Sequence, residues 1–414
     1  MNVYLAVILA VLAIDYFLGL VVESLNLKSV SPDVPEEFKG FYDAEKYARA
    51  QEYLRVVTRF GLVKDTFFFL LTLGFILAGG FNLVDSFARS FGGGTIATGL
   101  IFAAVVIWGL RLISIPFSVY RTFVIEARFG FNKTTAATFV TDMFKSLVIS
   151  SLIGAVAFAA IIWFFLTMSA AWFYCWVAIS LFQLFLTFIA PIVILPLFNT
   201  FVPLEDGELK TAIEDYARSQ KFLLSGVFTI DASRRSTKSN AYFTGLGKYR
   251  RIALFDTLIA KHTVGELVSV LAHEIGHYKK KHILKSQILS IAATGALFLL
   301  LSFFINNPGL FAAFKMEQLS VYASLFFFGF LYTPVSMVFS LVASVISRKH
   351  EFEADRYVAD TFSQPEAFIL ALKKLSVDNL SNLSPHPLKV FLQYSHPPVL
   401  QRIAFMRGLI KGRP

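Results

Sequence analysis

Seven runs of about 20 or more mostly apolar residues divide this chain of 414 residues. They lie at 3–24, 66–87, 97–119, 147–168, 172–198, 286–307 and 321–346. A helix needs about 20 such residues to cross the hydrocarbon core of a bilayer. With 56% hydrophobic residues, the chain also has more apolar surface than a soluble domain can usually bury. The sequence therefore predicts an α-helical membrane protein with seven spans.

The lysine and arginine residues alternate between rich and poor connecting segments. Segments 25–65, 120–146, 199–285 and 347–414 hold 7, 4, 14 and 10 of them, whereas each segment on the other side holds at most one. Because cytosolic loops carry the excess of positive charge, this pattern predicts an external N-terminus and a cytosolic C-terminus. It also explains the net charge of +10. We therefore expect the lipid bilayer, and no nucleic acid, as a partner.

The lengths of the connecting segments predict the domain organisation. Residues 1–198 hold five spans with their cytosolic loops, 199–285 form a cytosolic protease region, 286–346 hold the last two spans, and 347–414 form a cytosolic helical region. The fold class is a multi-span α-helical membrane protein with a small α+β region. Near the N-terminus, 43–60 is predicted to be an amphipathic helix that lies on the membrane surface.

The region 199–285 mixes helical and strand patterns. LEDGELKTAIEDYARSQ, which begins at Leu204, has the pattern of a helix. VFTIDAS, SNAYFTG and RRIALFDTLI are short, rich in β-branched and aromatic residues, and separated by turn-like sequences. They predict three short strands. VGELVSVLAHEIGHYKKKH then predicts a helix that runs toward the sixth span.

HEIGH, which begins at His273, is the motif that carries chemistry. His273 and His277 are four residues apart, so a helix places both imidazoles on one face, where they can share a metal. Glu274 lies roughly 100° around the helix and can reach a metal-bound water. Zinc lowers the pKa of such a water to about 7. We predict one zinc ion per chain and hydrolytic chemistry. A metal-binding transporter or channel, the alternative of another class, would not need Glu274 as a base.

A third zinc ligand must come from outside HEIGH, and the residues to consider are His282 and the carboxylates of EFEADRY. His282 lies nine residues after His273, which is about 900° on a continuing helix and therefore the opposite face. We expect it to be a helix-end or interfacial residue. In EFEADRY, Glu351 and Asp355 share a helical face and Glu353 points away. One of that pair can bind zinc while the other orients a ligand histidine.

An ordered set of motifs gives the chain a resemblance to a known family. HEIGH, SNAYFTG with RRIALFDTL, SRKHEFEADRY and YSHPPVLQRI, together with seven spans, resemble the type I CAAX prenyl endopeptidases. FGFNKTT and PLFNTFVPLEDGELK resemble that family too. The resemblance implies an integral-membrane zinc metalloprotease of the gluzincin type. It further implies a ring of helices around a water-filled chamber.

The same resemblance implies roles for individual residues. Glu351 becomes the third zinc ligand, and Asp355 becomes the carboxylate that orients a ligand histidine. Asn240 and His396 are implied to contact the scissile peptide, where both can stabilise the tetrahedral oxyanion as catalytic residues beside Glu274.

Further residues are candidates for support and for substrate binding. Arg402 can anchor Asp355 or a substrate carboxylate. Asn240, Ala241, Tyr242 and Phe243 form a strand on which a substrate can add as a further strand.

The resemblance also predicts the substrate and the membrane. Substrates are expected to be lipidated or membrane-bound peptides or proteins, cut near their C-termini. A protease that removes damaged membrane proteins is the alternative. Vertebrate members carry a long charged insertion between the FDTL strand and the HEIGH helix, where this chain has only IAKHTVGELVSVLA, and its KGRP end has no dilysine retrieval signal. We therefore expect a prokaryotic cytoplasmic membrane, with the endoplasmic reticulum membrane as the alternative.

Overall fold

The computed structural model describes residues 2–244 and 251–412, with the backbone alone for 241–244. Within these residues, seven helices are long and apolar enough to cross a membrane, which confirms the predicted number. They are α1 Val3–Lys28, α2 Ala44–Leu77, α4 Thr95–Tyr120, α5 Ala136–Thr167, α6 Ala171–Ile189, α10 His282–Ser302 and α12 Val321–Thr361. Shorter helical turns extend α4 to Glu126 and α6 to Leu197.

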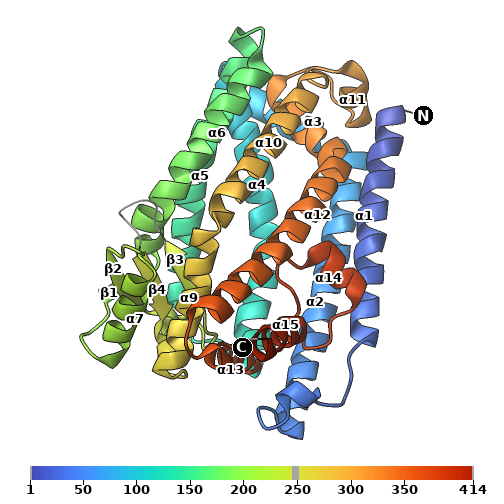
Figure 1. Cartoon of the computed structure of the whole chain (residues 1–414). Coiled ribbons are helices and arrows are strands. Elements are labelled where there is room, and N and C mark those ends of the chain that lie inside the picture. The colour runs from blue at the N-terminus through green and yellow to red at the C-terminus, as the bar shows by residue number, and fades with distance from the viewer. Residues whose placement is uncertain (1, 245–250, 413–414) are drawn as a thin grey trace.

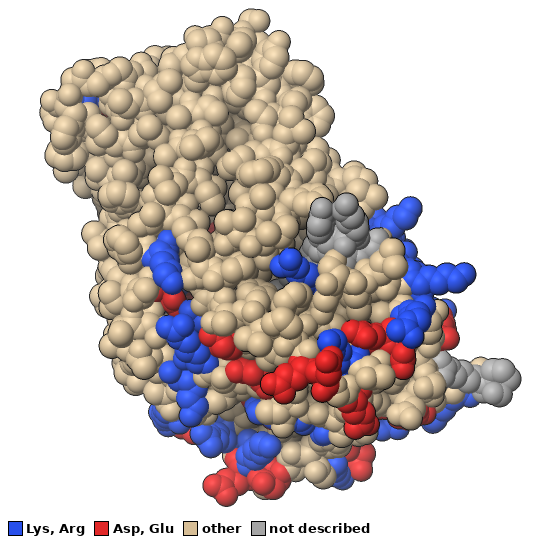
Figure 2. Space-filling model, turned by 90° about the vertical axis from the view of Figure 1, so that its left-hand side faces the viewer, with Lys and Arg blue, Asp and Glu red and all other residues tan. Residues whose placement is uncertain are grey.

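The long helices stand side by side, and smaller elements cover their two ends (Figure 1). The N-terminus lies at one end with the short helices α3 (Gly80–Arg89) and α11 (Pro308–Ala313). The sheet lies at the other end with the remaining helices. These are α7 Glu208–Ser219, α8 Asp256–Ile259, α9 Val264–Lys279, α13 Pro365–Asp378, α14 Pro387–Gln393 and α15 Val399–Lys411. On the face seen in Figure 2, the charged side chains gather at this second end, and the part formed by the spans shows almost none.

The sheet has four strands in the order β1-β2-β4-β3. Their bounds are β1 Phe201–Pro203, β2 Gly226–Ile230, β3 Ala241–Thr244 and β4 Arg251–Phe255. β2 and β4 pair in parallel at the centre, and both outer pairs are antiparallel. β2, β3 and β4 lie at the three predicted strand segments, but β2 ends at Ile230, and the DTLI part of RRIALFDTLI is the helix α8. Gly245 at the end of SNAYFTG and Arg250 at the start of RRIALFDTLI lie outside the described residues. Sequence patterns missed β1 because it has three residues and includes a proline, which a sheet accepts at its edge.

A hydrophobic core fixes the sheet and the helices around α9. Each of these elements contributes side chains that are almost fully buried. Examples are Ile213 from α7, Leu254 from β4, Leu271 from α9, Phe368 from α13 and Ile403 from α15. Because α9 packs at the centre of this core, its HEIGH motif is held at a fixed position relative to the spans.

Three helix bounds in the structure differ from the positions predicted from the sequence. The predicted amphipathic helix 43–60 is the first half of α2, a helix of 34 residues. Gly61 does not interrupt it, so the helix continues into the membrane span. The predicted span 66–87 ends earlier in the structure, because Gly79, with a left-handed φ of 74°, separates α2 from α3. The predicted domain boundary at 346 falls inside α12, because no glycine or proline interrupts the helix between Pro334 and Thr361.

Candidate metal centre

The helix that carries HEIGH begins at a well-defined cap. The Thr263 hydroxyl accepts from the backbone N–H of Glu266, and the Glu266 carboxylate accepts from the backbone N–H of Thr263. This reciprocal pair is a capping box, and it satisfies two N–H groups that a helix start leaves unpaired. Glu266 also forms an ion pair of 2.7 Å with Lys374 in α13. The start of α9 is therefore tied to the helix that packs behind the site.

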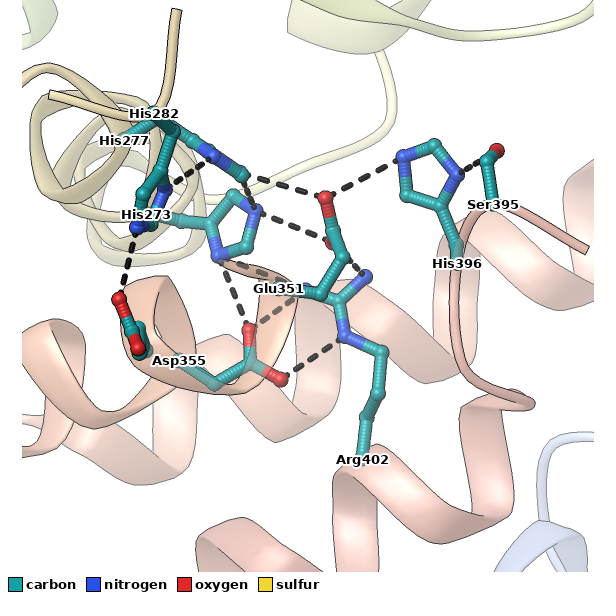
Figure 3. A network of polar contacts seen from close by, with 9 residues as sticks. His273, His277, His282, Glu351, Asp355, Ser395, His396 and Arg402 are labelled. Atoms are coloured by element: carbon teal, nitrogen blue, oxygen red, sulfur yellow. Dashed lines mark hydrogen bonds and ion pairs between the residues drawn. The ribbon is translucent and has the colours of Figure 1, made fainter. Parts of the chain in front are cut away.

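Three ligand groups from α9 and α12 converge in Figure 3. The Nε2 atoms of His273 and His277 are 3.0 Å apart. Glu351 Oε1 lies 3.3 Å from His277 Nε2, and Glu351 Oε2 lies 3.5 Å from His273 Nε2. One ligand atom from each residue lies within 4.8 Å of the others, a spacing at which one metal ion can be shared.

The chemistry of this donor set fits zinc. Two imidazole nitrogens and one carboxylate are ligands that zinc takes in catalytic sites, where a fourth position stays open for water. Glu351 is 4% exposed, and its Oε2 makes no hydrogen bond within the described part of the chain. Arg402 Nη1 lies 3.2 Å away but without hydrogen-bond geometry. A buried carboxylate oxygen without a hydrogen bond is costly, and a cation beside it removes that cost.

Asp355 and Arg402 support His273 from behind. Asp355 Oδ1 lies 2.9 Å from His273 Nδ1, and the fully buried Asp355 accepts two hydrogen bonds from Arg402, of 2.6 and 2.9 Å. Burial lowers the pKa of His273, but the carboxylates of Asp355 and Glu351 outweigh burial and raise it to about 9. His273 is therefore protonated at neutral pH without metal, and metal binding must release that proton.

His396 and Asn240 border the same cavity as Glu274. This cavity measures about 640 Å³ and also reaches His273, His277 and Glu351. His396 comes from the loop between α14 and α15, and its Nε2 lies 3.3 Å from Glu351 Oε1. Its side chain is 64% exposed, and its Nδ1 pairs with the Ser395 hydroxyl at 2.9 Å. The structure thus brings the predicted catalytic residues to one opening.

The predicted substrate strand is the last strand in the sheet order. Ala241, Tyr242 and Phe243 of β3 pair with Leu254, Ala253 and Ile252 of β4. No strand pairs with the other edge of β3 within the described residues. Asn240 directly precedes this strand, so the strand starts at the cavity.

His282 is a helix-end residue, as expected, but it does not lie on the face opposite His273, because α9 ends before it. Lys281 has a left-handed φ of 58°, which separates α9 from α10. His282 begins α10 and turns back, so that its Nδ1 lies 3.0 Å from His277 Nδ1. Nothing in YKKKH signals such a break, since left-handed backbone usually falls on glycine or asparagine.

Sequence patterns also missed Phe368, which lies beneath the site. Its ring stacks on the His273 imidazole with centroids 5.3 Å apart and planes at 22°. The Arg402 guanidinium lies over the same ring at 5.6 Å. One buried aromatic ring of α13 thus fixes both the ligand histidine and the arginine behind it. An apolar residue in an amphipathic helix gives no sequence signal of such a contact.

The chain matches two sequence families along almost its full length. Residues 23–200 match the family described as "CAAX prenyl protease N-terminal, five membrane helices". Residues 203–410 match "Peptidase family M48".

Individual proteins are similar to this chain over most of their length. It is 33% identical over 401 residues to CAAX prenyl protease 1 of Saccharomyces cerevisiae, covering 89% of this chain and 87% of that protein. It is 30% identical to the human CAAX prenyl protease 1 homolog, covering 91% and 89%. The crystal structure of S. mikatae Ste24p superposes with a TM-score of 0.93 at 30% identity, covering 98% and 99%.

Proposed function

Since the chain belongs to the CAAX prenyl proteases of peptidase family M48 and is a zinc metalloendopeptidase embedded in the membrane by several spans, we propose that it cuts lipidated or membrane-associated proteins near their C-termini. The observation that carries this proposal is the position of the metal centre. His282, the first residue of α10, contacts His277, and Glu351 lies on α12 itself. A peptide anchored in the bilayer by a lipid can therefore reach the site while its anchor stays in the membrane.

We propose that His273, His277 and Glu351 hold one zinc ion. When bound, zinc supplies a Lewis acid that lowers the pKa of a coordinated water to about 7. Glu274 borders the cavity from the same helix as the two histidines and accepts the proton of the attacking water. Asp355 and Arg402 keep the His273 ring in its orientation, because their hydrogen bonds fix its Nδ1 side.

Asn240 and His396 stabilise the oxyanion and align the peptide in this proposal. Both border the cavity, and the exposed His396 side chain can meet a substrate carbonyl. The backbone of Ala241, Tyr242 and Phe243 supports substrate binding by strand addition, since β3 is the outer strand on this side of the sheet. Main-chain pairing accepts many side chains, which suits an enzyme that recognises the lipid and the chain end.

We propose that the spans enclose a water-filled chamber, which supplies the water that hydrolysis consumes. The chain exposes 20755 Å². A compact soluble chain of 46.3 kDa would expose roughly 16,000 Å². Polar side chains also meet between the spans α6 and α10, where Gln183 donates to Gln287 and to Ser290. Helices that are exposed on an inner face as well as an outer one would give this excess surface, which supports the proposed chamber.

We propose that the sheet end faces the cytosol and the N-terminal end faces outward. The concentration of charge at the sheet end supports this orientation (Figure 2). At the other end, Arg89 pairs with the buried Asp85 at 2.7 Å and Lys315 donates to the carbonyl of Leu77 at 2.6 Å. Because both cations have structural partners, their external position does not contradict the rule that cytosolic loops carry the excess of lysine and arginine. Reporter fusions after residues 92, 169 and 314 should be external, and those after 35, 132 and 240 cytosolic. A fusion that reports the opposite side at any of these positions would contradict the proposed orientation.

The kind of membrane stays a prediction. We expected a prokaryotic cytoplasmic membrane, whereas the yeast and human relatives named above are eukaryotic. Fractionation of the source cells with a tagged chain would assign it.

The decisive experiment measures cleavage by the purified full-length protein. A farnesylated peptide that ends in a CAAX sequence should be cut near its C-terminus, and a zinc chelator should abolish the activity. The same peptide without its lipid is the control. Equal cleavage of both peptides would favour the quality-control alternative, and no cleavage of either would contradict the proposed substrate. Elemental analysis should give one zinc per chain for wild type and much less for His277→Ala and Glu351→Ala.

A further inference from the structure

The two histidines of HEIGH are supported in different ways. His273 Nδ1 meets the Asp355 carboxylate directly, at 2.9 Å. His277 Nδ1 meets a second imidazole instead, since His282 Nδ1 lies 3.0 Å away. The far nitrogen of that ring, His282 Nε2, lies 3.0 Å from Glu353 Oε2. Both ligand histidines thus reach a carboxylate, one directly and the other through His282.

The positions of the hydrogen atoms along this second chain follow from the chemistry of imidazole. A neutral imidazole has one N–H donor and one acceptor nitrogen. If His277 Nε2 binds a metal, its proton sits on Nδ1, which donates to His282 Nδ1. His282 must then carry its own proton on Nε2, and this N–H donates to Glu353. A carboxylate at that position accepts only, so Glu353 selects the tautomer of His282 that leaves His277 Nε2 with a lone pair for the metal.

The backbone is strained at the residue that creates this contact. Lys281 adopts a φ of 58°, a conformation that costs a residue with a side chain about 1 kcal/mol or more. On a continuing helix, His282 would lie on the face opposite His273. The left-handed Lys281 instead turns the chain so that His282 faces His277. Strain of this kind persists where the surrounding contacts fix it, and here those contacts lie beside the ligand.

Packing holds the His282 ring in place. The residue is 3% exposed, and its ring stacks on His350 with centroids 3.9 Å apart and planes at 10°. His350 is itself 6% exposed on α12. Glu353 lies on the same helix, and Lys285 approaches its carboxylate to 3.9 Å. Since His282 can neither rotate nor withdraw, it presents one nitrogen to each neighbour.

From these contacts we propose that His282 and Glu353 are positioning residues for the zinc ligand His277, as Asp355 is for His273. The inference rests on the proposed zinc site. It assigns a role to Glu353, the carboxylate of EFEADRY that was expected to point away from the metal. It also explains why α9 ends two residues after HEIGH instead of entering the membrane as one helix with α10.

The test measures zinc affinity in the purified full-length protein, by competition with a chromophoric chelator. His282→Ala should raise the zinc dissociation constant by roughly 10- to 100-fold, the usual cost of losing a group that orients a ligand. Glu353→Met keeps the length of the side chain but removes the acceptor, and should raise it by a similar factor. Glu353→Gln should stay within a few-fold of wild type, because its amide oxygen can still accept from His282. Lys280→Ala, at an exposed neighbour, is the matched control and should not change the affinity.

A double-variant cycle separates this role from a general structural one. If Glu353 acts through His282, then His282→Ala combined with Glu353→Met should be no worse than His282→Ala alone. Fully additive losses, or a wild-type affinity in Glu353→Met, would overturn the proposal. Should His282→Ala fail to fold, Glu353→Met against Glu353→Gln still decides, because Glu353 is partly exposed. A wild type that binds zinc but cuts no CAAX peptide would contradict the proposed function and leave this inference standing.

Discussion

Gly276 and Ala354 bring α9 and α12 into backbone contact. A Cβ atom on Gly276 would lie 3.2 Å from the Cα and 3.3 Å from the carbonyl oxygen of Ala354. Gly276 directly precedes His277, and Ala354 directly precedes Asp355. The two helices therefore lie close together beside their ligand-bearing turns, which brings the imidazoles and the carboxylates together.

Replacing Gly276 with alanine should damage the metal centre. The new methyl group would crowd the α12 backbone, which cannot move as a flexible side chain does, so the helices must separate slightly. We expect a loss of about 1–3 kcal/mol in stability and a weaker affinity for zinc. Thermal unfolding and chelator competition would measure both. Gly329→Ala, on α12 itself, is the control, since nothing lies within 4 Å of its added Cβ. An unchanged zinc affinity in Gly276→Ala would contradict the role of this contact.

Glu274→Gln should separate metal binding from turnover. The substitution keeps the size of the side chain and leaves the three proposed ligands in place, so zinc content should stay at one per chain. A neutral amide cannot accept the proton of the attacking water at pH 7. Turnover of a farnesylated CAAX peptide should therefore fall by roughly two to four orders of magnitude. Near-normal turnover with zinc retained would remove Glu274 from the mechanism.

Arg348 should matter for substrate alignment and not for zinc. It lies one turn before Glu351 and donates to the carbonyls of Val390 and Tyr394, at 3.1 and 2.6 Å. These bonds hold the segment that leads to His396. Arg348→Met should lower kcat/KM by roughly 10- to 100-fold through a misplaced His396, with zinc content unchanged.

The control for Arg348 is a variant that removes a different contact of α14. Lys389 anchors α14 from its other side, through an ion pair of 2.6 Å with Glu23. Lys389→Met removes that anchor but keeps both bonds of Arg348, so it should have the smaller effect on kcat/KM. Equal losses in the two variants would show that α14 as a whole, and not the His396 segment, sets the activity.

The Glu37 ion pairs should make stability depend on pH in the acid range. Glu37 lies 2.8 Å from Arg407 and 2.9 Å from Lys373. The hydrogen bond from Arg407, with smaller contributions from Lys373, holds the pKa of Glu37 below its ordinary 4.5. The ionised carboxylate therefore stabilises the fold above pH 4.5, and this contribution is lost as the pH falls through the lowered pKa.

Glu37→Gln tests that dependence. At pH 7 the variant should be less stable than wild type by about 1 kcal/mol or less, since the site is partly exposed. The difference should shrink as the pH falls below 4.5 and should vanish once wild-type Glu37 is protonated. Thermal unfolding of both proteins from pH 7 to pH 3 measures it. A difference that is the same at every pH would mean that the charge of Glu37 is not involved.

The sequence predicted the spans well because a span is a local property. Length and hydropathy within each run decide it, and the seven helices follow from them. Helix ends were predicted less well, since they depend on single backbone conformations. Gly79 ends α2 early, and Lys281 breaks a helix with no glycine or proline to announce it. Because of the break at Lys281, His282 is a helix-end residue as expected but faces His277 instead of pointing away from it.

The sequence predicted the residues of the candidate site that lie in motifs, but not the residues that hold them in place. His273, His277 and Glu274 are recognisable because a four-residue spacing defines a helical face. Periodicity alone left Glu351 and Asp355 equivalent, and the family resemblance distinguished them. Phe368 has no motif, since it contacts the site from α13 through a stacked ring. Arg348 lies within SRKHEFEADRY, but no sequence pattern shows that it donates to the carbonyls of Val390 and Tyr394.

The unbroken course of α12 constrains how this protein can evolve. One helix of 41 residues forms the seventh span and carries Glu351 and Asp355 beyond it. Inserting or deleting one residue between Pro334 and Glu351 would rotate the two carboxylates by about 100° about the helix axis, away from the histidines of α9. Substitutions on the lipid-facing side of that segment have no such effect. The seventh span can therefore change its composition freely over evolutionary time, but its number of residues is fixed by the active site.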